Sequence, residues 1–127
     1  MDPAVPPADP QPTPSAMRRA LRRAADGLTL DVTEAAVLLD LGLRSYRRWK
    51  ADGPGRLGRD GKARLSNLMG IHKGLRLIFG DSPRVYAWIN APNAAFGGMS
   101  ALDVMLRGEL TDLIRVRRYI DAERGGW

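Results

Sequence analysis

The feature that most constrains this fold is a long apolar stripe between residues 61 and 79. Its apolar side chains recur every three or four residues, which is the repeat of one helix face. Ile71 and Ile78 widen the stripe, so we expect a helix buried on two sides, with Asp60 as its N-cap. The sequence therefore predicts a spine that joins two halves of the chain. The residues at helical spacing are Leu65, Leu68, Met69, His72, Leu75, Arg76 and Phe79.

Upstream of the spine, the sequence predicts two short helices over about residues 34–40 and 44–51. Thr33 or Asp31 can cap the first helix. The run Leu41-Gly42-Leu43 is expected to form a tight turn in which Gly42 takes the left-handed backbone. A helix pair joined by a short turn containing glycine is typical of a helix-turn-helix.

The second helix of this pair carries the residues expected to contact DNA. Its N-terminal part would meet base edges or phosphates if the helix entered the major groove. Tyr46 and Trp49 are three residues apart and are expected to pack inward. A helical hairpin that binds no DNA has a similar sequence, and in that alternative the cations are solvated surface. The DNA-binding candidates are Arg44, Ser45, Arg47, Arg48 and Lys50.

The N-terminal end of the chain is predicted to hold a tail and one helix. Residues 1–14 contain six prolines and are expected to be a disordered tail. Ser15 is the expected N-cap of a helix over about residues 16–26, with Met17, Leu21, Ala24 and Leu28 on its inner face. The side chains expected to face solvent are Arg18, Arg19, Arg22 and Arg23.

Three further helices are predicted after the spine, over about residues 83–91, 101–107 and 109–123. Ser82 or Asp81 caps the first, Ser100 caps the second, and Gly108 ends it. The last helix has an inner face of Leu110, Leu113, Ile114, Val116 and Ile120. The predicted fold class is all-α, with no strand expected.

Charge and composition indicate which kinds of partner the chain is suited to bind. The chain has 20 basic and 14 acidic residues, and 12 of the basic and 8 of the acidic ones precede residue 65. This excess, mostly arginine, favours an anionic partner at the front half. The absence of cysteine excludes disulfides and thiol catalysis and fits a cytoplasmic protein. No apolar run approaches a membrane span, and the start Met1-Asp2-Pro3 is not expected to be a secretory signal.

No enzyme motif occurs in the sequence. It has no paired carboxylates placed for catalysis, no metal-ligand spacing and no nucleophile elbow. Gly97-Gly98 is too little to form a phosphate cradle. His72 is the only histidine and lies within the apolar stripe, so we expect a structural role. We therefore expect no catalytic residue, no metal and no cofactor.

The back half resembles the toxin-binding domain of the Xre/MbcA/ParS antitoxin family. The run from Arg64 to Asp81 resembles the long helix of that domain. Trp88-Ile89, Pro92-Asn93 and Phe96-Gly97-Gly98 resemble its ordered motifs, and the segment 100–108 follows its pattern. Ala101 replaces a common proline, and Phe96 replaces a usual leucine, but both keep the apolar pattern. The resemblance is strong over about residues 64–127 and weaker over 16–60.

The resemblance implies an antitoxin paired with a RES-domain toxin, which acts on NAD as a hydrolase or ADP-ribosyltransferase. The C-terminal region of such an antitoxin covers the NAD pocket of the toxin, and the front half represses the operon as a homodimer. The domains expected on this basis are a Pro-rich tail at 1–14, a helix-turn-helix domain at 15–60 and a toxin-binding domain at 61–127.

The C-terminal tail is the expected plug of the toxin pocket. Gly125 and Gly126 let the chain turn freely, and Trp127 is a residue type enriched at interface hot spots. The alternative is a frayed end with a solvated arginine face. Two alternative functions also stay open: a stand-alone dimeric transcription regulator, and an adaptor without DNA binding. The toxin-binding candidates are Arg107, Arg115, Arg118, Tyr119, Glu123, Arg124 and Trp127.

Overall fold

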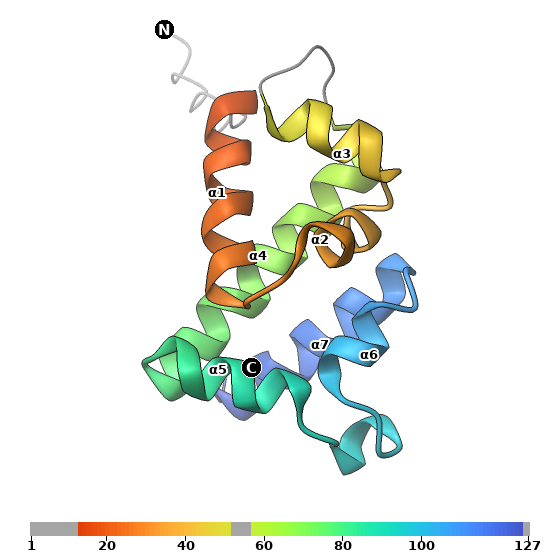
Figure 1. The fold of residues 1–127 in the computed structure, drawn as a ribbon. Helices are drawn as coiled ribbons and strands as arrows, with labels where there is room; N and C mark the ends of the chain where they lie inside the picture. The colour runs from red at the N-terminus through yellow and green to blue at the C-terminus, as the bar shows by residue number, and fades with distance from the viewer. Residues whose placement is uncertain (1–12, 52–56, 126–127) are drawn as a thin grey trace, which may run out of the picture.

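The computed structural model describes residues 13–51 and 57–125, and in these ranges helices joined by short turns and loops make up the fold (Figure 1). The described ranges contain no strand, only one isolated bridge between Pro92 and Ser100. The predicted all-α class is confirmed. The elements are α1 (Pro14–Gly27), α2 (Val32–Leu38), α3 (Leu43–Lys50), α4 (Arg59–Phe79), α5 (Ser82–Asn90), the 3-10 helix η1 (Ala94–Phe96), α6 (Ala101–Met105) and α7 (Leu110–Glu123).

Helix α4 is the spine of the molecule. It runs diagonally from the half that holds α1, α2 and α3 to the half that holds α5, α6 and α7 (Figure 1). Helix α1 and helix α7 pack against it, and one apolar cluster joins the two halves. The spine prediction is confirmed, but Met69 and Ile78 are 42% and 41% exposed. Both were expected inside, and the reason is that α1 and α7 leave part of the α4 surface uncovered.

The first helix begins earlier than the sequence suggests. Thr13 is the N-cap, because its Oγ1 accepts a hydrogen bond from the Ala16 amide at 3.1 Å. Pro14 occupies the first turn of the helix, where a missing N–H costs nothing. Ser15 is therefore not the cap, and the helix already begins at Pro14. Residues 1–12 of the expected tail lie outside the described residues.

The turn between α2 and α3 differs from its prediction at one residue. Asp40, with φ 53°, takes the left-handed conformation, whereas Gly42 has φ −62° and is the extended N-cap of α3. The prediction for Gly42 is wrong, because the reversal occurs two residues earlier, where aspartate tolerates this backbone region. Asp31, rather than Thr33, caps α2 in a reciprocal capping box with Glu34.

The caps of the back half follow the sequence closely, with one exception. Asp81 caps α5, and Ser100 caps α6 by accepting a hydrogen bond from the Asp103 amide at 3.0 Å. Asp60 does not cap α4, whose N-cap is Gly58, because the Asp60 carboxylate pairs with Arg64 instead. Among the helices that the structure describes, none is long and apolar enough to cross a membrane.

Candidate functional site

Helix α3 turns its aromatic side chains inward and its cations outward. Tyr46 and Trp49 are 1% and 4% exposed, as predicted. Burial and the nearby Asp26 raise the pKa of Tyr46, so its phenol stays neutral. Residues 44, 47 and 48 fall within about 100° around the helix axis, so their side chains share one face. Of the five DNA-binding candidates, four are exposed and Lys50 is half-buried: Arg44, Ser45, Arg47, Arg48 and Lys50.

Two arginines of α1 hold the C-terminal end of α3. Arg18 Nε donates to the Trp49 carbonyl at 2.5 Å, and Arg22 Nη2 donates to the Lys50 carbonyl at 2.8 Å. Carbonyls in the last turn of a helix lack the usual N–H donor four residues on, and their partial negative charge favours cations. The guanidinium of Arg18 also lies 5.6 Å from the Trp49 ring centre. The sequence placed both arginines on the solvent face, but Arg18 is only 7% exposed.

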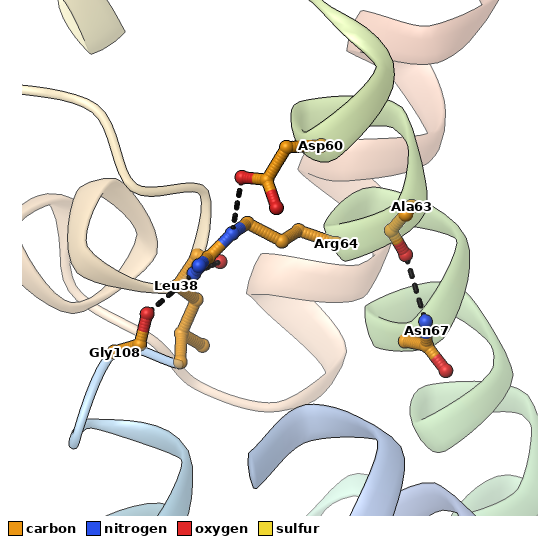
Figure 2. Close-up of polar contacts among 6 residues, drawn as sticks. All are labelled: Leu38, Asp60, Ala63, Arg64, Asn67 and Gly108. Carbon is orange, nitrogen blue, oxygen red and sulfur yellow. Dashed lines mark hydrogen bonds and ion pairs between the residues drawn. The ribbon is translucent and has the colours of Figure 1, made fainter. Parts of the chain in front are cut away.

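Arg64 connects the two halves at the centre of the molecule (Figure 2). Its Nη1 donates to the Gly108 carbonyl at 2.7 Å and to the Leu38 carbonyl at 3.4 Å. Its Nε pairs with Asp60 at 2.7 Å, and the residue is 5% exposed. Leu38 is the last residue of α2, and Gly108 lies in the turn before α7. One side chain thus ties the helix-turn-helix to the C-terminal helix, a role that the sequence did not indicate.

The outer face of α7 carries most of the toxin-binding candidates. Positions 115, 118, 119 and 123 share one side of the helix by the three- and four-residue spacing. Arg115, Arg118 and Glu123 are exposed, and Tyr119 is half-buried. The inner face packs through Leu113, Val116 and Ile120, as predicted, whereas Leu110 and Ile114 are half-buried. Arg107 is exposed in the turn before the helix, so it stands apart from this face.

An aromatic cluster lies beside this face of α7. Tyr119 stacks on Trp88 with ring centres 6.2 Å apart and meets the edge of Phe96 at 5.3 Å. Phe79 adds a further ring, 6.5 Å from Trp88. Arg115 lies 5.3 Å from the Phe96 ring centre and donates to the Ala95 carbonyl at 3.2 Å. A small cavity of about 70 Å³ opens among Phe79, Trp88, Tyr119 and Glu123.

The sequence did not assign the other three rings to this surface, because they come from three separate segments. Phe79 ends α4, Trp88 lies in α5, and Phe96 ends η1. The only sequence feature that pointed to these three rings was their place within the family-like motifs. The cluster orients Tyr119 and Arg115, so these two candidates are held in place before any partner binds.

The end of α7 carries two ion pairs to one carboxylate. Arg124 Nη1 and Arg117 Nε each lie 3.8 Å from a carboxylate oxygen of Asp121. Both arginines are therefore partly neutralised within the chain. Trp127, the expected plug, lies outside the described residues, which end at Gly125.

The side chain of His72 is half-buried against the end of α1. It lies against Gly27, where any side chain would collide with the imidazole. Burial, and then the charge of Arg76, lower the pKa of His72. In the described ranges, no three His, Cys, Asp or Glu residues come together in a way that could hold a metal ion.

Two protein-family models match the chain, one over each half. The family model of the antitoxin Xre-like helix-turn-helix domain matches residues 13–70. The antitoxin Xre/MbcA/ParS C-terminal toxin-binding domain matches residues 74–126. This chain belongs to the Xre/MbcA/ParS family of antitoxins. The two matches meet inside α4, so the spine of this antitoxin serves both domains.

Of the individual proteins that resemble this chain, one solved structure is a toxin–antitoxin complex. The antitoxin is 43% identical over 105 residues to the protein y4oB of Sinorhizobium fredii, covering 82% of this chain and 81% of that protein. Its fold is similar to the crystal structure of the Mycobacterium tuberculosis MbcT–MbcA toxin–antitoxin complex, with TM-score 0.63 and 26% identity. This match covers 87% of this chain and 95% of that one. A 37-residue stretch is 68% identical to FO synthase of Nocardia farcinica, but it covers only 4% of that enzyme.

Proposed function

We propose that this antitoxin neutralises a RES-domain toxin, which hydrolyses NAD or transfers its ADP-ribose, by covering the NAD pocket with its C-terminal region. The observation that carries the proposal is the exposed cationic face of α7 beside the aromatic cluster, within the residues that match the toxin-binding domain. Arg115 and Arg118 are suited to acidic groups at a pocket rim, because guanidinium binds carboxylate with two parallel hydrogen bonds. Tyr119 supplies a rigid apolar contact of the kind found at hot spots.

The tail completes this contact in the proposal. Arg124 and Trp127 follow α7 directly, and the two glycines between them allow the chain to turn into a pocket. Glu123 at the rim of the aromatic cavity offers a carboxylate to a basic group of the toxin. Arg107 lies on the same domain but apart from the α7 face, so we assign it to the periphery of the interface.

Co-expression with the adjacent open reading frame tests the toxin half of the proposal. Growth is scored with the full chain, with residues 124–127 removed, and with Arg118→Glu. We expect the full chain to rescue growth and both variants to fail, while the matched control Lys62→Glu, a charge reversal on exposed α4 surface, rescues fully. A neighbour that is harmless, or that never co-purifies, would favour the stand-alone transcription regulator. Rescue by the truncated chain would remove the tail from the proposal.

We further propose that α3 reads operator DNA and that the protein acts as a homodimer in the cytoplasm. Arg44, Arg47 and Arg48 form one exposed cationic face on the second helix of the helix-turn-helix. Two such helices in a dimer would enter successive major grooves about one helical turn apart. Arginine is the usual partner of guanine edges and phosphates there.

Fluorescence anisotropy with a duplex from the promoter of the operon tests this second half. Replacing Arg44 and Arg47 with Glu should weaken binding about 100-fold or more, because two attractive contacts become repulsions. The same variant should still rescue growth against the toxin, and Arg84→Glu on exposed α5 surface should bind DNA normally. Light scattering on the purified chain reports the dimer. Unchanged DNA affinity of the variant would remove Arg44 and Arg47 from the DNA contact, and no DNA binding by the wild type would support the adaptor without DNA binding.

A further inference from the structure

A groove runs along α4 between α1 and α7, on a side of the molecule that the proposed function does not use. It encloses about 700 Å³. Helix α1 contributes Ala20 and Arg23, and α7 contributes Arg117. The exposed stripe of α4 between them includes Met69, Lys73 and Leu77, which are spaced four residues apart and therefore share one face.

The groove combines an apolar floor with a basic rim. Met69 and Leu77 are 42% and 60% exposed, which is high for two large apolar side chains on one helix face. Arg23, Lys73 and Arg117 line the same groove, and none of its lining residues that the structure describes is acidic. Arg23 and Lys73 make no hydrogen bond or ion pair with any residue of the described ranges.

Gly70 gives the groove its shape on the α7 side. Arg117 lies over this glycine, and a Cβ there would come within 2.5 Å of the Arg117 guanidinium carbon. Arg117 Nη1 also donates to the Ser66 carbonyl at 3.3 Å, which holds the side chain across α4. The position of Arg117 on this side of the groove is thus set by the packing of α7 against α4.

We infer that this groove binds an acidic segment of the toxin that carries apolar anchor side chains. The inference rests on the proposed function and adds a second contact surface to it. Carboxylates would pair with the rim, and the anchors would cover Met69 and Leu77. A toxin is favoured as the source because residues 74–126, which match the toxin-binding domain, supply part of the groove lining, including Leu77 and Arg117.

Two other occupants fit the groove less well. A second copy that docks groove to groove would bring the two basic rims together, which costs free energy. DNA would satisfy the cations, but phosphates gain nothing from the apolar floor. These occupants are outcomes of the test below.

Lysine reactivity can report whether the groove is occupied, because the chain has only three lysines. Lys73 lies in the groove, Lys50 lies on α3, and Lys62 is exposed near the start of α4. Acetylation of the full chain, followed by mass spectrometry, gives the reactivity of each lysine alone, with the purified toxin, and with operator DNA. We expect the toxin to slow labelling of Lys73 by about tenfold while Lys62 stays unchanged, as burial in an interface requires.

Affinity for the toxin gives an independent readout. Lys73→Glu and Arg23→Glu should each raise the dissociation constant about tenfold, since an attraction in the groove becomes a repulsion. The matched control Lys62→Glu changes the same charge on the same helix and should bind as the wild type. All three side chains are exposed, so the variants should fold, and circular dichroism checks this.

The outcomes separate this inference from the proposed function. If the toxin binds but Lys73 stays reactive and both groove variants bind normally, the inference fails while the proposed function stands. If no complex forms, the proposed function itself fails. Protection of Lys73 by DNA, or by raising the concentration of the chain alone, would assign the groove to DNA or to a second copy and overturn the inference.

Discussion

At the scale of single residues, several important side chains are polar groups that pack against another segment of the chain. Arg18 and Arg64 are 7% and 5% exposed, and both donate to backbone carbonyls at helix ends. His72 sits in the space left by Gly27. In each case a polar side chain of one segment pairs with a backbone carbonyl of another segment or fills the space beside it. Such residues are sensitive points, because an unpaired buried polar group costs about 1–3 kcal/mol.

Stability should depend on pH through His72. Burial and Arg76 lower its pKa below the ordinary 6.5, so the folded chain binds this proton less tightly than the unfolded chain. The stabilising contribution is complete above about pH 6.5 and is lost as the pH falls below that value. We expect the melting temperature to drop more steeply between pH 7 and pH 5 in the wild type than in His72→Gln. Equal slopes in the two proteins would show that His72 does not titrate in this way.

At the scale of elements, α3 is stabilised mainly from outside itself. It has eight residues, no side-chain cap at its start, and basic residues in its last turn. A helix this short is marginal alone. Its buried Tyr46 and Trp49 and the two α1 arginines at its C-terminal end set its position on the core. The position of the exposed cationic face of α3 is therefore set by α1 as well.

Removing one of these contacts should loosen α3 without removing any of its exposed cations. Arg22→Ala deletes the hydrogen bond to the Lys50 carbonyl and should cost about 0.5–1 kcal/mol of unfolding free energy. Arg19→Ala, an exposed arginine of the same helix, removes the same charge and should cost less. Thermal melts of both variants give the comparison. If the two melts coincide, Arg22 contributes only its charge.

At the scale of the whole molecule, two domains share one spine and one core. The matches to the two family models meet inside α4, and the apolar cluster runs from α1 through α4 to α7. Arg64 adds a polar link between the end of α2 and the turn before α7. The two halves are thus expected to unfold together in one transition rather than as independent units.

Arg64→Met should weaken the whole molecule. Methionine keeps much of the side-chain volume but leaves the Leu38 and Gly108 carbonyls without their donor, at a cost of about 2–4 kcal/mol. Urea unfolding followed by fluorescence and by circular dichroism measures the loss and shows whether the two halves still unfold together. Lys62→Met, an exposed residue two positions earlier, is the control and should be nearly neutral. A loss no larger than that of the control would contradict the role given to Arg64.

The sequence by itself determined the helices, most of their caps and the family, because these depend on local periodicity and short-range hydrogen bonds. The inner faces of α1 and α3, three of the five inner residues of α7 and the cap Ser100 could be predicted in this way, and Asp81 was one of two caps expected for α5. It also located the exposed cations of α3 and the outer face of α7, whose roles toward DNA and toxin stay predictions.

Only the tertiary structure decided how distant segments complete one another. Burial of Arg18 and Arg64, the aromatic cluster around Tyr119 and the groove along α4 each need groups from at least two segments far apart in sequence. The exposure of Met69 and Ile78 has the same origin, since helical spacing shows which side chains share a face but not which neighbours cover it. Local chemistry sets the elements, whereas their mutual packing sets the surfaces available to a partner.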